Sequence, residues 1–300
     1  MSQVKVTSAE VAALAGVSQS AVSRVFTPGA SASAKTALKV RQAAVKLGYR
    51  PNSIARAMVS GKSRIIGLVV AYLENQFYPE ALEKLSAMLQ DRGYHVLIFM
   101  ANTATDNLDE ILGEILDYQV DGIVAASVAL SSQLLDRCQN AGVPVVLFNR
   151  SQDLQSLSSV TSDNIQGGRK VAKFLLATAP NRIGYIAGWE GASTQRDREF
   201  GFRQRLAESG RDIDVRTIGN FHMDSARQAT LEMFDHKAPP DAVFVANDHM
   251  AFAVMDTLRF ELGVDVPNEV SVVGYDDVPT AAWRAYDLTT VRQPVNQMVA

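Results

Sequence analysis

The chain has 300 residues, of which 47% are hydrophobic and 20% are charged, a composition typical of a globular protein with two or three compact units. The formal net charge of −3 hides an asymmetry along the chain. Residues 1–64 contain ten lysines and arginines and one acid, Glu10, whereas residues 65–300 contain 19 basic and 31 acidic side chains. A basic segment joined to an acidic body is expected when only the basic segment meets a polyanion.

Cys138 is the only cysteine, which excludes an intrachain disulfide and a cysteine metal cluster and suits a reducing cytoplasm. The N-terminus lacks a charged region leading into an apolar run, and no segment approaches the roughly 18 consecutive apolar residues of a membrane-spanning helix. We therefore expect a cytoplasmic protein with no membrane partner.

Residues 7–26 are typical of two short helices joined by a glycine turn. Thr7 and Glu10 have the spacing of a capping box, so a helix should begin at Ser8 and end at Gly16. The residues expected to form its apolar face are Val11, Leu14 and Ala15.

A second helix should follow Ser18, which can cap it. The side chains expected to face the first helix are Val22, Val25 and Phe26, and those expected to face outward are Gln19, Ser20, Ser23 and Arg24. This is the helix-turn-helix pattern, whose second helix enters the major groove of DNA. An ordinary helical hairpin is the alternative, but the basic charge of residues 1–64 favours DNA binding.

Base edges are expected to be contacted by Gln19, Ser20 and Arg24. Contacts with the DNA backbone are expected from Thr7, Ser18, Ser23, Thr27 and Lys35. A turn at residues 27–32 and a third helix at residues 33–47, closed by Gly48, complete a small basic domain. Between Pro51 and Gly61 there are too few helix-compatible residues for a helix that is stable alone, so this segment should be a linker or a conditional helix.

From residue 65 onward, short apolar runs alternate with helical patterns, which predicts parallel sheets covered on both faces. The runs are residues 65–70, 95–100, 122–127, 144–148, 182–188, 241–246 and 271–275. A body of this length is expected to form two doubly wound lobes, with their boundary near residues 150–163, where the polar stretch 151–159 lies.

Polar and aromatic residues follow several of these strands, where open α/β sheets bind ligands. Asparagine, aspartate and arginine can bond hydroxyl groups and aromatic rings can cover apolar sugar faces, so the set suits a polyhydroxylated ligand. The expected contacts are Leu73, Phe77, Tyr78, Asn149, Arg198, Phe221, Asn247 and Asp276. The strand ends also carry Tyr72, Arg150, Asp248 and Asp277. The alternatives to a ligand contact are that Asp248 and Asp277 cap helices, that Arg150 forms a surface ion pair, and that Phe221 belongs to the core.

Catalysis has little support in the sequence. None of the four histidines has metal-ligand spacing, and there is no P-loop, nucleophile elbow or dinucleotide fingerprint. His249 could face the ligand site or be structural. We expect no catalytic residue, no metal and no cofactor.

The chain resembles the lac repressor (LacI/GalR) family of transcription regulators over essentially its whole length. The matching motifs are AEVAALAGVSQSAVSRV (9–25), SAKT (33–36), GYRPNSIARAMVSGKSRIIGLVV (48–70), NQFYPE (75–80), VDGIV (120–124), GVPVVLFNR (142–150), VTSDNIQGG (160–168), RDREFGF (196–202), VFVANDHMA (243–251), VSVVGYDD (270–277) and LTTVRQP (288–294). The resemblance implies a dimeric repressor with helix-turn-helix heads, hinge helices that form on operator DNA, and a two-lobed body like a periplasmic sugar-binding protein that closes on an effector.

On this basis we expect an all-α helix-turn-helix domain at residues 1–50, a hinge at 51–62, and an α/β effector-binding and dimerisation domain at 63–300. The effector is expected to be a sugar or related carbohydrate, and Gln293 joins its contacts. The other partners are near-palindromic operator DNA and a second copy of the chain. In the hinge, the minor groove is expected to be contacted by Asn52, Ala55 and Met58, with Met58 standing where family members commonly have leucine.

Two further features depart from the family pattern. Phe174 and Leu175 stand where a His-Leu pair is common, and the pattern continues past Ala300 with a further helix and strands. The C-terminal end of the body is therefore expected to be incomplete after a helix that begins at Val295. Two other classes remain open: a stand-alone binding protein, which should begin with a signal peptide, and an α/β enzyme with a DNA-binding head, which should show turnover.

Overall fold

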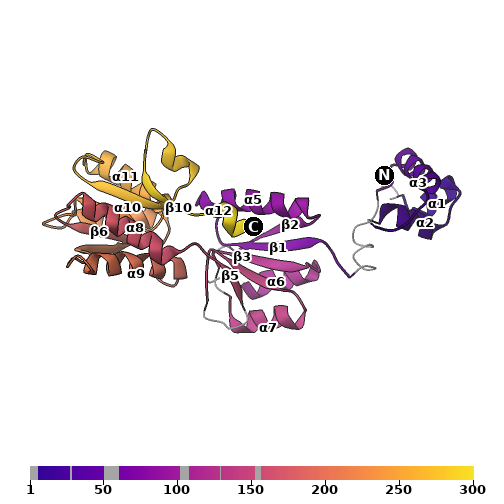
Figure 1. Cartoon of the computed structure of the whole chain (residues 1–300), viewed down its shortest axis with the longest axis horizontal. Coiled ribbons are helices and arrows are strands. Elements are labelled where there is room, and N and C mark those ends of the chain that lie inside the picture. The colour runs from indigo at the N-terminus through magenta and orange to yellow at the C-terminus, as the bar shows by residue number, and fades with distance from the viewer. Residues whose placement is uncertain (1–5, 28, 51–60, 102–107, 129, 153–156) are drawn as a thin grey trace. The chain divides into compact units, whose positions relative to one another are not determined.

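The computed structural model describes residues 6–27, 29–50, 61–101, 108–128, 130–152 and 157–300. The chain forms two compact units, Met1–Ser63 and Arg64–Ala300 (Figure 1). The hinge residues Asn52, Ala55 and Met58 lie outside the described residues.

The first unit contains three helices, α1 (Ser8–Ala15), α2 (Gln19–Phe26) and α3 (Ala34–Leu47). The capping box at the start of α1 is present, since the backbone N–H of Thr7 donates to Glu10 Oε2 at 2.7 Å and the Thr7 hydroxyl accepts from the Glu10 N–H. The small core of this unit consists of Val11, Ala12, Ala15, Val22, Val40, Ala43 and Ala44.

Leu14 does not belong to this core, and the prediction that placed it there is wrong. Its side chain is 46% exposed, whereas Ala12 is 6% exposed. Because α1 packs against both α2 and α3, its buried face is centred between Val11 and Ala12, and Leu14 is rotated away from that centre.

The second unit contains two five-stranded parallel sheets. The first sheet has the order β2-β1-β3-β4-β5, with β1 (Ile65–Val70), β2 (His95–Met100), β3 (Gly122–Ala126), β4 (Val145–Phe148) and β5 (Ser158–Val160). The second has the order β10-β9-β8-β6-β7, with β6 (Ile183–Ala187), β7 (Val215–Ile218), β8 (Ala242–Val245), β9 (Ser271–Asp276) and β10 (Thr289–Arg292).

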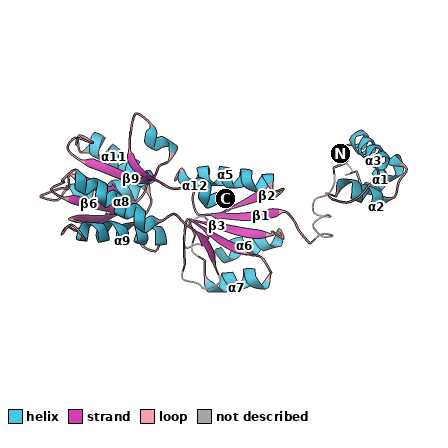
Figure 2. Ribbon diagram, in the orientation of Figure 1, coloured by secondary structure: helices cyan, strands magenta, loops and turns pink. Residues whose placement is uncertain are grey.

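Helices cover both sheets, which confirms the predicted doubly wound fold (Figure 2). The helices of the first lobe are α5 (Phe77–Asp91), α6 (Leu108–Asp117) and α7 (Ser132–Asn140), with α5 on one side of the sheet and the other two on the opposite side. Those of the second lobe are α8 (Asn164–Ala177), α9 (Ser193–Ala207), α10 (Met223–Phe234) and α11 (Asp248–Asp256), and α11 continues as a π-helical turn at Thr257–Glu261. No helix of the described residues is long and apolar enough to cross a membrane.

Within the described residues, the chain passes between the lobes twice. It leaves the first lobe after β5, which pairs with β4, and enters the second lobe at α8. It returns after β10 to α12 (Val295–Val299), which begins at the expected residue and packs against α5 of the first lobe. The carboxyl ends of the strands are therefore the places where residues from both lobes can approach one another.

Candidate functional site

The outward face of α2 consists of exposed polar side chains. Ser18 begins the helix by accepting a hydrogen bond from the backbone N–H of Ala21 at 3.3 Å, and Val22 on the inward face is fully buried. The exposed outward residues are the predicted ones, Gln19, Ser20, Ser23 and Arg24. Short polar side chains and an arginine at the start of a helix can form the hydrogen bonds that distinguish base edges.

Hydrogen bonds hold the first turn of α2 in place. Gln19 Nε2 donates to Ser8 Oγ of α1 at 2.8 Å, and the hydroxyls of Ser18 and Ser20 lie 2.9 Å apart. The carbonyl oxygen of the Gln19 side chain can still accept a hydrogen bond from a base amine. The guanidinium group of Arg24 has no hydrogen bond or ion pair with another described residue, so it is available to guanine or phosphate.

The residues predicted to contact the DNA backbone, Thr7, Ser18, Ser23, Thr27 and Lys35, are all exposed. Some of them also have local structural roles. Thr7 and Ser18 cap helices, and Thr27 Oγ1 donates to the Ser23 carbonyl at 2.8 Å. The basic side chains of α3 and the residues after it are exposed too: Lys35, Lys39, Arg41, Lys46 and Arg50. The first unit thus presents several cations and a polar helix face to solvent.

In the second unit, Arg198 is the centre of a buried polar network. Its side chain is 2% exposed, and its Nε donates to Asn164 Oδ1 at 2.9 Å. Its Nη1 donates to the carbonyl of Ala246 at 2.6 Å, and its guanidinium lies 3.8 Å from the centre of the Tyr275 ring. These contacts hold the group rigidly at the end of β8.

Asp276 joins this network at the end of β9. Its Oδ1 lies 3.4 Å from Arg198 Nη2 and accepts from Gln293 Nε2 at 2.7 Å, while Gln293 Oε1 accepts from Ser162 at 2.7 Å. Burial raises the pKa of Asp276, and the positive charge of Arg198 opposes that rise. The structure therefore brings three of the predicted ligand residues together.

The helix cap that the sequence offered to Asp248 is provided by Asn247 instead. Asn247 caps α11, since its Oδ1 accepts from the Met250 N–H at 3.0 Å, and its NH₂ group can still donate to a ligand. Asp248 caps nothing: it is buried and accepts from Thr290 Oγ1 at 2.6 Å and from the Val278 N–H at 3.0 Å. Burial, and secondly the nearby charge of Asp276, raise its pKa to about 7.

The capping alternative is also wrong for Asp277. Its carboxylate accepts a hydrogen bond from Arg292 Nε, and the short 3-10 helix that follows at Pro279–Ala282 is preceded by Val278 instead.

The predicted residues of the first lobe form a separate group. Asn149 Nδ2 donates to the Tyr78 hydroxyl at 3.4 Å, and the Tyr78 ring lies edge-on to Tyr72 at 5.6 Å. Phe77 is 1% exposed and stacks on Phe148, so it belongs to the core. Leu73, by contrast, is 38% exposed.

Phe221 lies at the end of β7 and is 6% exposed within the main core cluster, as its alternative interpretation proposed. Its ring also meets the first lobe, because the Arg150 guanidinium lies 5.7 Å from its centre. Arg150 is itself only 6% exposed, so the alternative of a surface ion pair is wrong.

Arg150 bridges the lobes. Its Nη1 donates to Thr194 Oγ1 of α9 at 2.7 Å, and its Nη2 donates to Ser127 Oγ of its own lobe at 3.2 Å. Next to it, the Ser151 N–H donates to Ser193 Oγ at 2.9 Å. The end of β4 is thus bonded directly to the first turn of α9.

Several buried polar atoms near the strand ends lack a hydrogen-bond partner among the described residues, including Asn149 Oδ1, Arg150 Nε and His249 Nε2. An unpaired buried polar atom is costly, so such atoms are candidates for ligand contacts. Burial lowers the pKa of His249, which favours its neutral imidazole.

The backbone is strained at the same strand ends. Ser127, Asn149, Phe221, Asp276 and Asp277 have φ angles of 63°, 57°, 63°, 131° and 58°. Non-glycine residues rarely adopt this region, and such strain gathers at ligand sites because it is part of how side chains are aimed.

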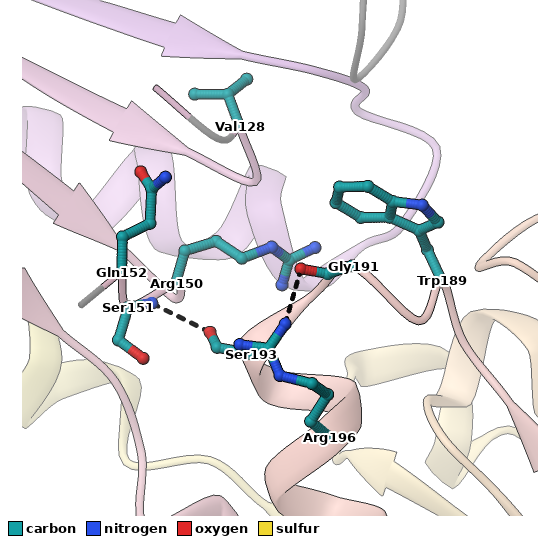
Figure 3. A pocket seen from close by; sticks show the side chains of 8 residues that line it. All are labelled: Val128, Arg150, Ser151, Gln152, Trp189, Gly191, Ser193 and Arg196. Atoms are coloured by element: carbon teal, nitrogen blue, oxygen red, sulfur yellow. Dashed lines mark hydrogen bonds between the residues drawn. The ribbon is translucent and has the colours of Figure 1, made fainter. Parts of the chain in front are cut away.

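A cavity of about 230 Å³ lies beside Arg150 (Figure 3). It is lined by Val128, Arg150, Ser151, Gln152, Trp189, Gly191, Ser193 and Arg196. None of these is among the nine predicted ligand residues. The strand-end rule drew attention to Arg150, but the residues at the start of α9 follow a loop and had no comparable signal. Within the described residues, no group of histidine, cysteine and acidic side chains could hold a metal ion.

Models of two known protein families match this chain. The model described as "Periplasmic binding proteins and sugar binding domain of LacI family" matches residues 63–299, and that of "Bacterial regulatory proteins, lacI family" matches residues 7–52. The HTH-type transcriptional regulator CelR of Thermobifida fusca is 33% identical over 297 residues, which cover 96% of this chain and 87% of CelR.

Two solved structures are similar over nearly the whole chain. The lac repressor dimer bound to operator and the anti-inducer ONPF is 27% identical with a TM-score of 0.86, covering 99% of this chain and 90% of that one. A CelR–cellobiose complex is 31% identical with a TM-score of 0.73, covering 98% and 90%.

Proposed function

The chain belongs to the LacI family of bacterial regulatory proteins, and we propose that it represses transcription as a homodimer on near-palindromic operator DNA under the control of a carbohydrate effector. The observation that carries this proposal is the exposed polar face of α2 in a unit whose exposed lysines and arginines far outnumber its acids. The lac repressor dimer on its operator supports the same assembly.

We assign base readout to Gln19, Ser20 and Arg24, and positioning on phosphates to Thr7, Ser18, Ser23, Thr27 and Lys35. In the hinge, outside the described residues, we assign minor-groove contacts to Asn52, Ala55 and Met58. A pair of short apolar helices can order on DNA and wedge into a base step, and Met58 has the largest apolar side chain of the segment.

For the effector, we propose a site between the lobes at the carboxyl ends of the strands. Unpaired atoms of Asn149 and His249 and the free amide of Asn247 offer hydrogen bonds to hydroxyl groups, held in place by the Arg198–Asp276–Gln293 network. A related regulator in complex with cellobiose supports a carbohydrate as the class of effector.

We further propose that the chain is not an enzyme. The buried acids Asp248 and Asp276 are committed to hydrogen bonds and an ion pair within the second lobe, as expected of structural groups. Turnover of the bound carbohydrate by purified protein would contradict this part of the proposal.

The test is a selection of preferred DNA sites by the full chain, followed by titration of the selected site with a panel of carbohydrates. A near-palindromic consensus whose binding changes in the presence of one carbohydrate supports the proposal. Binding that is equal for all sequences, or that no carbohydrate changes, contradicts it.

A further inference from the structure

The cavity beside Arg150 has an unusual set of donors. The first lobe supplies Val128, Arg150, Ser151 and Gln152, and the second supplies Trp189, Gly191, Ser193 and Arg196. Two of the eight lining residues are arginines and none is acidic. The cavity is thus positively charged and is shared by the two lobes (Figure 3).

Arg150 is a buried cation that no carboxylate of the described residues contacts directly, although the charges of Arg150 and Asp276 attract each other from a distance. It is 6% exposed, and its side chain donates only to neutral oxygens, those of Asn149, Thr194 and Ser127. Among the described residues no carboxylate forms an ion pair with it, and its Nε has no partner. A buried charge is costly unless it is paired, so this group calls for a negative ligand in contact with it.

The amino end of α9 reinforces this charge. The helix has 15 residues, and Ala192 at its N-cap position provides no side-chain hydrogen bond. The backbone N–H groups of the first turn therefore remain available to a ligand, and the helix dipole adds a partial positive charge there. Anions bind at such helix ends because the N–H groups point at them and the dipole favours negative charge.

Side chains of the same turn add donors. The Ser193 hydroxyl accepts from the Ser151 N–H at 2.9 Å, so its own proton is free to be donated. Arg196 is exposed, and its Nη1 donates to the Gly191 carbonyl at 3.0 Å, which folds its side chain back toward the start of the helix (Figure 3). Donors thus reach the cavity from an arginine of each lobe, a hydroxyl and a helix end.

We propose that this cavity binds the phosphoryl group of a phosphorylated carbohydrate. Donors that converge from several directions suit an oxyanion with several acceptor oxygens, and the Trp189 indole in the wall can cover the apolar face of a sugar ring. The inference rests on the proposed effector control and narrows the effector from a neutral sugar to an anionic one. Because the cavity includes both lobes, the bound group holds Arg150 and α9 together.

The test compares inorganic phosphate, a set of sugar phosphates and the corresponding neutral sugars. Each is added to the full chain at constant ionic strength, and the apparent melting temperature is measured with chloride as the reference. A ligand that binds only the folded state raises this temperature with its concentration. We expect phosphate to raise it at millimolar concentration and one sugar phosphate to raise it at far lower concentration than its neutral sugar.

The variants are Arg196→Gln and, as a matched control, Arg205→Gln. Both remove one positive charge from α9, but Arg205 lies more than two turns further along and donates to Ser209 Oγ at 2.7 Å. We expect Arg196→Gln to weaken phosphate binding about tenfold and Arg205→Gln to leave it unchanged, because only the first loses a charge-assisted contact. Arg150→Gln should abolish binding, and its circular dichroism spectrum shows whether it folds.

Operator binding of each variant without ligand is measured on the same samples. If the operator is bound but phosphate raises no melting temperature, or if the Arg196 and Arg205 variants respond equally, the anion site is wrong while the proposed regulator stands. If a neutral sugar binds as tightly as its phosphate, the anion site is likewise wrong. If inorganic phosphate binds through Arg196 but no sugar phosphate binds more tightly, the ligand is the free anion and the narrower effector assignment fails. If the unmodified protein does not bind the operator, the proposed function is wrong, whatever phosphate does to the melting temperature.

Discussion

Breaking the Arg198–Asp276 pair should destabilise the second unit strongly. Both side chains are 2% exposed, so solvent does not screen the charges, and Nη2 and Oδ1 lie 3.4 Å apart. Arg198→Met leaves the Asp276 carboxylate buried without its ion-pair partner, and Asn164 and the Ala246 carbonyl lose a donor as well. Removing one partner of a buried pair costs about 3 to 5 kcal/mol, which we expect for this variant.

The measurement is urea unfolding of the full chain, followed by the fluorescence of Trp189 and Trp283, both of which lie in the second unit. Asp276→Asn should also lower the midpoint, but the double variant should cost less than the sum of the single ones, because neither charge is then left alone. Arg203→Met is the matched control. Arg203 also pairs with two acids, Glu199 and Asp212, but its side chain is 37% exposed, so solvent screens its charge. A loss below about 1 kcal/mol for Arg198→Met, or strict additivity in the double variant, would refute the reasoning.

Three further predictions concern pH and DNA. Because burial raises the pKa of Asp248 to about 7, the folded state keeps a proton that the unfolded state releases near pH 4, so stability should fall as pH rises from about 4 to about 7. Asp248→Asn should flatten that part of the profile of urea midpoint against pH, and an unchanged slope would contradict the assignment. Exchanging Gln19 and Ser20 for other residues should change the selected DNA consensus, whereas Lys35→Ala should weaken binding to all sequences alike; site selection with both variants distinguishes these effects. Met58→Ser should remove most of the preference for operator over random DNA without changing effector affinity, and a variant that keeps full preference would show that Met58 is no wedge.

The sequence predicted the strands wherever they are apolar. The runs at β1 and β2 coincide with the observed strands, the run at 271–275 is one residue shorter than β9, and the other predicted runs each contain one strand. A strand was also expected near Ile218, where β7 lies, and the strands that the sequence missed are β5 and β10, which are only three and four residues long and carry polar side chains. β5 and β10 end their sheets, where one side of a strand meets solvent and continuous apolar character is not required.

The ligand residues were predictable only in part. Strand ends are visible in a sequence, so Asn149 and Asp276 could be found there. The partners that decide what a polar side chain does are distant in the chain: Arg198 meets Asp276 across 78 residues, and Arg150 meets Thr194 across 44. The sequence pattern of Arg150 is equally compatible with a surface ion pair, and only folding of both lobes shows that it is buried.

An effector can control DNA binding only if it binds one arrangement of the lobes more tightly than the other. A ligand that binds both arrangements equally leaves their populations unchanged. Hydrogen bonds between the lobes join Arg150 to Thr194, Ser151 to Ser193, and Thr280 to Gln76. Ring contacts of Arg150 with Phe221 and of Tyr72 with His222 add to them. Hydrogen bonds of this kind contribute about 1 kcal/mol each, so these three together contribute a few kcal/mol to the balance between the arrangements. A ligand held by donors from both lobes can change the free-energy difference between the two arrangements by the same few kcal/mol. The ratio of their populations then changes by about two or three orders of magnitude. The hydrogen bonds of Arg150 and Ser151 at the end of β4 lie in the wall of the cavity, so a ligand there acts directly on two of these contacts.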